Sequence, residues 1–139
     1  MRTFVLIIIA VISYLLGSLN GSIIVSRRLF HKDIRRYGSG NAGLTNFHRT
    51  FGLAGFVLVF LIDFFKAFIA AQIGGALMGI FGYAMVGKLF AGFCAMLGHS
   101  YPVFFGFRGG KGVLAGIGML FAADWRIACI CMIVFIAVV

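Results

Sequence analysis

The stretch FGLAGFVLVFLIDFFKAFIAAQI, residues 51–73, decides the fold. As a helix it would be roughly 35 Å long, enough to cross a bilayer core of about 30 Å with some tilt. Two charges interrupt it, Asp63 and Lys66, which share one helical face because they are three residues apart. A charge inside a membrane span is costly unless it pairs or faces a polar cavity. The two residues therefore either neutralise each other or belong to a substrate site.

The composition extends this reading to the whole chain. Hydrophobic residues make up 63% of the 139 positions and charged residues 11%, and the mean hydropathy is +1.13. So few polar groups cannot cover a water-soluble globule of this size. The sequence predicts an all-α integral membrane protein, a multi-span helical bundle with short re-entrant or interfacial helices. Three cysteines lie in apolar runs without metal-ligand spacing, so we expect packing roles and no metal site.

Two more apolar regions precede and follow this span. The first begins at residue 4 and continues to residue 25, which is long enough to cross, and it is interpreted as a retained span rather than a cleaved signal peptide. The other, residues 74–98, is rich in glycine, and we expect a turn near Gly74 and Gly75. Its only charge is Lys88. Either Lys88 faces the bundle interior or the membrane portion begins near Leu89.

The last part of the chain contains two short apolar runs in place of one long one. Residues 113–123 and 127–139 are apolar runs separated by residues 124–126, and neither run alone crosses a bilayer. We expect a re-entrant helix followed by a span that is cut short. Because the sequence stops within an apolar run, we also expect a further cytoplasmic segment in the parent protein. The 139 residues are predicted to form a single membrane domain.

Basic residues predict the orientation. Six of them lie between the first two spans, and Arg108 and Lys111 lie between the third and fourth apolar regions, whereas the turn near Gly74 carries no charge. Positively charged loops remain in the cytoplasm, so the N-terminus is expected outside. Both basic loops are then cytoplasmic and can share one site.

The first basic loop, residues 36–49, combines residue types that bind phosphate. Glycines let backbone N–H groups approach an anion, hydroxyls and amides add neutral donors, and arginines supply charge. The glycines are Gly38, Gly40 and Gly43; the hydroxyls are Ser39 and Thr45; the amides are Asn41 and Asn46; the arginines are Arg36 and Arg49. The pattern Gly38-x-Gly40-x-x-Gly43 also matches a dinucleotide fingerprint, but it lies between membrane spans rather than in a βαβ unit.

The second loop contains GHSYPVFFGFRGGKG, residues 98–112. Gly109, Gly110, Lys111 and Gly112 resemble part of a P-loop, yet Phe105 stands where the required glycine would be and no hydroxyl follows the lysine. Nucleotide hydrolysis is therefore not expected. Glycine amides next to a lysine still indicate phosphate binding.

Three motifs in register resemble one family. The pattern G-S-G-N-x-G-x-T-N-x-x-R after the first span, D-x-x-K in the second and G-H-x-x-P-x-F-x-x-F-x-G-G-K-G before the fourth are similar to the bacterial acyl-phosphate:glycerol-3-phosphate acyltransferases, the PlsY family. The chain departs from the family at Leu44, at Ala67 and at Leu114. The family's third cytoplasmic motif, with an asparagine and basic residues, has no counterpart in these 139 residues.

The resemblance implies transfer of a fatty acyl group from acyl phosphate to the 1-hydroxyl of glycerol 3-phosphate at the cytoplasmic face of the bacterial inner membrane, without cofactor, metal or nucleic acid. It assigns Ser39, Arg49 and Lys111 to recognition of glycerol phosphate. It assigns the acyl phosphate to a cradle made of Gly40, Asn41, Gly43, Thr45, Asn46, Gly109 and Gly110, beside which we also place Gly38, Gly112, Asp63 and Lys66. The net charge of +9 would concentrate both anions near the protein.

The general base is left open by the sequence. No histidine is followed by an aspartate at the spacing of an H-x-x-x-x-D dyad. The favoured hypothesis is that a phosphate oxygen of the acyl donor accepts the hydroxyl proton, and His99 is the second candidate. Two other functions compete with the enzyme: an anion transporter subunit with glycine-broken segments, and a noncatalytic membrane scaffold.

Overall fold

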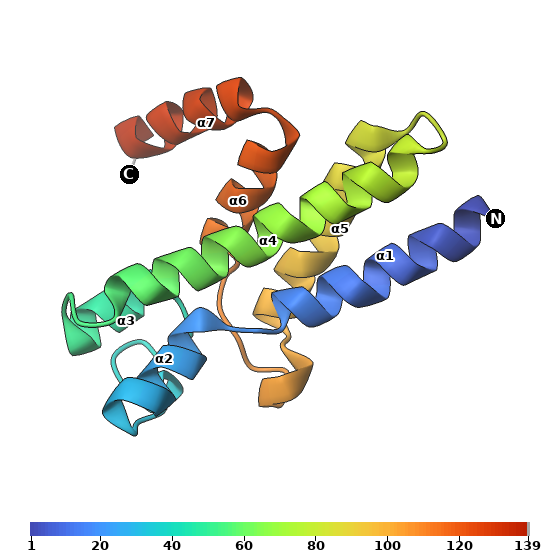
Figure 1. The fold of residues 1–139 in the computed structure, drawn as a ribbon. Coiled ribbons are helices and arrows are strands. Elements are labelled where there is room, and N and C mark those ends of the chain that lie inside the picture. Colours follow the sequence, from blue (N-terminus) through green and yellow to red (C-terminus); the bar gives the residue numbers. More distant parts are fainter. Residues whose placement is uncertain (139) are drawn as a thin grey trace.

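The computed structural model describes residues 1–138, and every regular element in that range is helical. In chain order the elements are α1 (Arg2–Gly17), α2 (Gly21–Phe30), η1 (Ile34–Arg36), α3 (Leu44–Phe51), α4 (Phe56–Gly79), α5 (Ala84–Ser100), η2 (Val103–Phe105), α6 (Val113–Ala123) and α7 (Trp125–Val138). Helix α4 is central and packs against α1, α5 and α6. Both glycine-rich loops lie toward one end of this bundle, and the N-terminus and the α4–α5 turn lie at the other (Figure 1).

Two segments are long and apolar enough to cross a membrane: Arg2–Phe30, which contains α1 and α2, and α4. The expected first span is not one continuous helix, because α1 ends at Gly17 and α2 begins at Gly21. Asn20 stabilises the break: its side-chain oxygen accepts a hydrogen bond from the Ile23 N–H at 3.0 Å and caps α2. The break brings the start of α2 beside α4.

The prediction of a turn near Gly74 and Gly75 is wrong. Helix α4 continues through both glycines to Gly79, and the chain turns at residues 80–83. The glycines instead allow close packing of α4 on α5, since a Cβ at Gly74 would collide with the Gly87 carbonyl. Gly75 makes room for the aliphatic part of Lys88, which is half-buried. Lys88 therefore packs along α4 with its stem covered.

The helix over residues 113–123 is confirmed as α6. The next helix begins at Trp125, two residues before the expected start. Asp124 accounts for the difference, because its carboxylate accepts a hydrogen bond from the Arg126 N–H at 2.8 Å and so caps α7 at its first turn. Helix α7 turns away from α6 rather than continuing its direction (Figure 1).

Small residues fill the interior of the bundle and large apolar residues face outward. Ala67 and Ala70 of α4 are fully buried, whereas Leu61, Phe65 and Ile69 of the same helix are 41%, 45% and 48% exposed. Close packing of helix backbones through small residues is typical of membrane bundles, in which large side chains face lipid. This distribution agrees with the integral membrane fold predicted from composition.

Candidate active site

Three buried ionisable side chains meet where α1, α4 and α5 pack together. The Lys66 ammonium lies 2.8 Å from Asp63 Oδ1 and 2.9 Å from His99 Nδ1, and it donates to the Leu19 carbonyl at 2.9 Å. Asp63 Oδ1 also accepts from the Gly21 N–H at 3.0 Å. Their side chains are 1%, 4% and 3% exposed for Asp63, Lys66 and His99. The predicted Asp63–Lys66 pair therefore forms, and it joins the helix break after α1 to α5.

The first loop is held by one asparagine. Asn46 Oδ1 accepts from the Ser39 N–H at 3.0 Å, and its Nδ2 donates to the carbonyls of Tyr37 at 3.1 Å and Asn41 at 3.0 Å. Gly38 must lack a side chain because a Cβ there would collide with Asn46 Oδ1, and its φ of +57° is left-handed. Asn46 and Gly38 thus shape the loop from within.

The second loop packs directly on the first. The Gly109 and Gly110 N–H groups donate to the carbonyls of Ser100 at 3.1 Å and His99 at 3.2 Å. The Ala42 N–H donates to the Gly109 carbonyl at 3.4 Å. A Cβ at Gly110 would collide with both the Ala42 carbonyl and His99 Nε2. The glycine pair therefore permits contact between the two loops, and its own amides are occupied by protein carbonyls.

Arg35 ties the loops together through its side chain. Its guanidinium forms a bidentate pair with Asp33, with Nε–Oδ1 and Nη2–Oδ2 distances of 3.0 and 2.8 Å. The remaining nitrogen, Nη1, donates to the carbonyls of Phe105 at 2.6 Å and Arg108 at 3.0 Å. The hydrogen bonds from Arg35 hold the pKa of Asp33 well below its usual range, with Arg27 adding to the effect, and the same pairing raises the pKa of Arg35.

A polar cavity of about 220 Å³ lies between the loops and the buried cluster. Helices α3 and α6 both begin at its wall, with Gly43 and Gly112 as their N-caps, and neither start has a side-chain cap. The first-turn N–H groups of two helices, which carry partial positive charge, therefore lie beside one cavity. The lining residues are Asn41, Gly43, Leu44, Thr45, Asp63, His99, Lys111, Gly112, Val113, Leu114 and Ile117.

A second, larger cavity of about 650 Å³, called the arginine cavity below, has four arginines and Asp33 in its lining. It contains Ser39, Gly40 and Gly109 from the predicted site. Arg36 belongs to the loop predicted to bind phosphate, whereas the sequence predicted only the orientation from Arg27, Arg35 and Arg108, which line the same cavity. Their clustering on both basic loops was the available signal. Arg27 and Arg35 are paired with Asp33, which lines the same cavity, so within residues 1–138 Arg36 and Arg108 are the lining arginines outside an ion pair. Guanidinium groups of this kind suit an anion.

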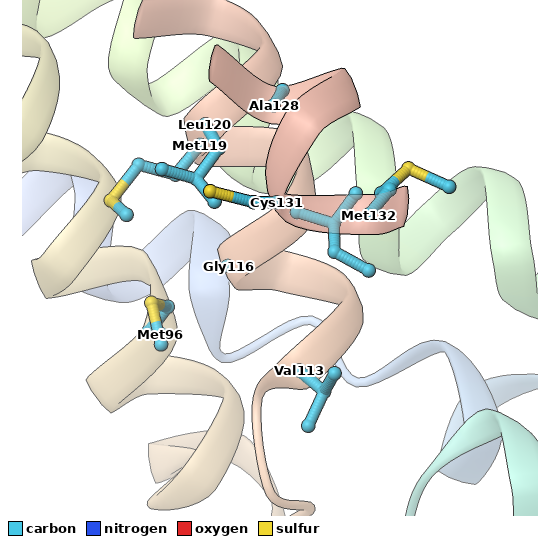
Figure 2. A pocket seen from close by; sticks show the side chains of 9 residues that line it. Met96, Val113, Gly116, Met119, Leu120, Ala128, Cys131 and Met132 are labelled. Atoms are coloured by element: carbon cyan, nitrogen blue, oxygen red, sulfur yellow. The ribbon is translucent and has the colours of Figure 1, made fainter. Parts of the chain in front are cut away.

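A third cavity, of about 310 Å³, is apolar and lies between α5, α6 and α7. Figure 2 shows Met96 on α5, Met119 on α6, and Cys131 and Met132 on α7 around this space. Val113 and Ile117 of α6 line both this cavity and the polar one. An apolar space thus adjoins the two helix N-termini.

The predicted site residues therefore separate into groups. Asn41, Gly43, Thr45, Asp63, His99, Lys111 and Gly112 line the polar cavity, and Ser39, Gly40 and Gly109 line the arginine cavity. Gly38, Asn46, Lys66 and Gly110 lie behind these surfaces and contact their walls. Arg49 is exposed on α3 and lines neither cavity.

Comparison with known proteins identifies relatives. The model of the glycerol-3-phosphate acyltransferase family matches residues 7–139. The chain is 38% identical over 139 residues to the glycerol-3-phosphate acyltransferase of Finegoldia magna, covering 100% of this chain and 68% of the relative. It is 42% identical over 143 residues to that of Clostridioides difficile, covering 100% and 69%. The chain thus spans about two thirds of the length of these relatives.

The fold has solved counterparts. The crystal structure of PlsY (YgiH), an integral membrane glycerol 3-phosphate acyltransferase, in its glycerol 3-phosphate form is similar with a TM-score of 0.79 at 38% identity, covering 96% of this chain and 64% of that one. Its lysophosphatidic acid form gives a TM-score of 0.77 at 34% identity with the same coverage. In sequence and in fold alike, the chain belongs to the glycerol-3-phosphate acyltransferase family, whose members are membrane acyltransferases.

Proposed function

We propose that this chain, acting as one membrane domain, transfers a fatty acyl group from an acyl phosphate to the 1-hydroxyl of sn-glycerol 3-phosphate. The products are lysophosphatidic acid and phosphate, so the reaction serves phospholipid synthesis. The observation that carries the proposal is the meeting of two uncapped helix N-termini with Lys111 at one polar cavity. This arrangement favours a phosphate group.

The acyl phosphate fits the polar cavity. Its phosphate would accept hydrogen bonds from the first turns of α3 and α6 and from the Asn41 and Thr45 side chains, which line the same space. The adjoining apolar cavity would accept the start of the acyl chain, since Val113 and Ile117 border both spaces. A substrate with a charged head and a long apolar tail matches this junction of cavities.

Glycerol 3-phosphate fits the arginine cavity. Its phosphate is largely a dianion at neutral pH, and the guanidinium groups of Arg36 and Arg108, which are not paired with Asp33, can bind it through paired hydrogen bonds. Ser39 lines this cavity and adds a hydroxyl donor. Lys111 is exposed and lines the neighbouring polar cavity, whereas Arg49 is exposed and lines neither, so its contact with glycerol phosphate remains what the resemblance implies. Relatives of this chain are named for this acceptor, which supports the choice.

Held in neighbouring cavities, the two substrates would react by direct acyl transfer. The glycerol hydroxyl oxygen attacks the acyl carbon, a new ester C–O bond forms, and the bond from the acyl carbon to the phosphate oxygen breaks. The hydroxyl proton passes to the departing phosphate, so no protein base is required. Fixed helix N–H groups and Lys111 stabilise the charge that gathers on that phosphate.

Orientation follows from the same arrangement. Both basic loops lie toward one end of the bundle (Figure 1), and we propose that this end faces the cytoplasm of the bacterial cell, with the N-terminus outside. The soluble acceptor would reach the site from the cytoplasm. The acyl chain would remain within the bilayer.

The experiment is a donor comparison with the full chain in liposomes. With labelled glycerol 3-phosphate, we expect lysophosphatidic acid from palmitoyl phosphate, no product from palmitoyl-CoA, and an unchanged rate in a metal chelator. Product from palmitoyl-CoA alone would contradict the donor assignment. Anion flux into liposomes without product would instead indicate a transporter, and neither flux nor product a scaffold.

A further inference from the structure

The Lys66 ammonium has an acceptor for each of its three hydrogens. They are the Leu19 carbonyl at 2.9 Å, Asp63 Oδ1 at 2.8 Å and His99 Nδ1 at 2.9 Å. An ammonium group donates three hydrogen bonds and accepts none. His99 Nδ1 must therefore present its lone pair to Lys66, and in the neutral ring the proton lies on Nε2.

A second proton on His99 is opposed by its surroundings. A proton on Nδ1 would point at a cationic nitrogen 2.9 Å away. The nearest alternative acceptor, Asp63 Oδ1, is 3.4 Å from Nδ1 and already accepts from Lys66 and from the Gly21 N–H. Two charged groups line the cavity beside the ring: the Lys111 ammonium, which disfavours a further cation, and the Asp63 carboxylate, whose Oδ2 has no hydrogen-bond partner within residues 1–138. The contact with Lys66 therefore turns the Nδ1 lone pair toward the ammonium and fixes the tautomer of the neutral ring.

The Nε2 side of the ring faces the site. The ring lines the polar cavity together with Lys111 and the starts of α3 and α6. Gly110 passes close to Nε2 and leaves space for it only because it has no side chain. Within residues 1–138, no protein acceptor forms a hydrogen bond with Nε2. An N–H group without a protein partner, on a residue at the wall of an anion cavity, is a donor for a ligand oxygen.

We infer that His99 is a fixed Nε2–H donor to an oxygen of the acyl phosphate bound in the polar cavity, and not the general base. This inference rests on the proposed function for the identity of the ligand, while the tautomer rests on geometry alone. His99 keeps its proton throughout the reaction, and the hydroxyl proton goes to the departing phosphate. Lys66 and Asp63 are positioning residues that act through His99.

The first test reads the tautomer without turnover. The full chain is labelled with ¹⁵N-histidine in nanodiscs, and the exposed His31 and His48 serve as internal references. We expect His99 to show an unprotonated Nδ1 and a protonated Nε2 at neutral pH, and to lose this fixed tautomer in Lys66→Met. Addition of palmitoyl phosphate should shift the Hε2 signal. A proton on Nδ1, or an Hε2 signal that does not move at saturating palmitoyl phosphate, would overturn the inference.

The second test uses two substitutions that differ only in donor ability. The glutamine amide can place a nitrogen donor near the Nε2 position but cannot act as a base, whereas phenylalanine offers neither. We expect His99→Gln to retain kcat within about tenfold of wild type and His99→Phe to lose about 10²-fold to 10³-fold. Equal losses in two folded variants would indicate a base and refute the donor role. A wild-type chain without acyl transfer would refute the proposed function instead, and the labelling experiment would still decide the tautomer and the contact.

Discussion

Asp33 shows how one side chain organises both loops without touching the polar cavity. It accepts from Arg27 at 2.8 Å and from Arg35, which bonds in turn to two carbonyls of the second loop. Its own side chain is 17% exposed, so water screens the pair only partly. Removal of the charge would therefore free Arg35 and loosen the contact between the loops.

We expect Asp33→Asn to lower stability at pH 7 by about 1–2 kcal/mol, seen as a lower thermal midpoint in detergent. Because folding lowers the pKa of Asp33, the wild-type advantage is fully present above the unfolded-state pKa of about 4 and is lost as pH falls below it. The gap between the two proteins should stay constant from pH 8 to 5 and narrow in acid.

Asp124→Asn is the matched control, since it removes the same charge and asparagine caps a helix as well as aspartate does. It should leave the midpoint nearly unchanged. If both substitutions lower the midpoint equally, the loop contact is not the cause.

At the scale of the helices, sequence patterns succeeded where local signals were sufficient. The helix predicted at residues 113–123 is flanked by Gly112 and Asp124, which mark its ends, and the structure reproduces it. The prediction of a turn at Gly74 was wrong because a glycine pair is compatible both with a turn and with a close contact between helices. Only the approach of Gly87 from α5 distinguishes the two.

The helix contact gives a direct prediction. Gly74→Ala should destabilise the protein by about 1–3 kcal/mol, because the added methyl group collides with the backbone of α5. Gly79→Ala, five residues further along the same helix, would meet only Ala84 at an ordinary 3.6 Å and should be neutral or stabilising by up to about 1 kcal/mol. Thermal midpoints of the two variants test this. Equal effects would mean that the helices do not approach closely at Gly74.

In the candidate site too, some residues could be predicted from local sequence and others could not. Loop residues such as Asn41 and Thr45 could be assigned from their composition because a phosphate needs local donors. The pairing of Asp63 with Lys66 followed from helical spacing. Contacts between distant segments could not be predicted: Arg35 bonds to carbonyls 70 and 73 residues away, and His99 joins Lys66 across 33 residues. No local pattern encodes such pairs.

For the whole molecule, the arrangement predicts that both basic loops lie on one side of the membrane and the α4–α5 turn on the other. With the native cysteines replaced, we expect Arg28→Cys and Phe104→Cys to react with a membrane-impermeant maleimide only after the cells are permeabilised. Ile80→Cys, in the turn between α4 and α5, should react in intact cells. All three side chains are exposed, so accessibility within the protein does not limit labelling. Reaction of Ile80→Cys and Phe104→Cys from the same side would exclude the proposed topology.

The central claim is that two phosphates occupy two different cavities, and the Michaelis constants of two variants test it most directly. Ser39 lines the arginine cavity and Asn41 the polar one. Ser39→Ala should raise KM for glycerol 3-phosphate by about tenfold or more with little change in KM for palmitoyl phosphate, and Asn41→Ala should do the reverse. If both variants raise the same KM, or if the pattern is exchanged, the assignment of the two cavities is contradicted.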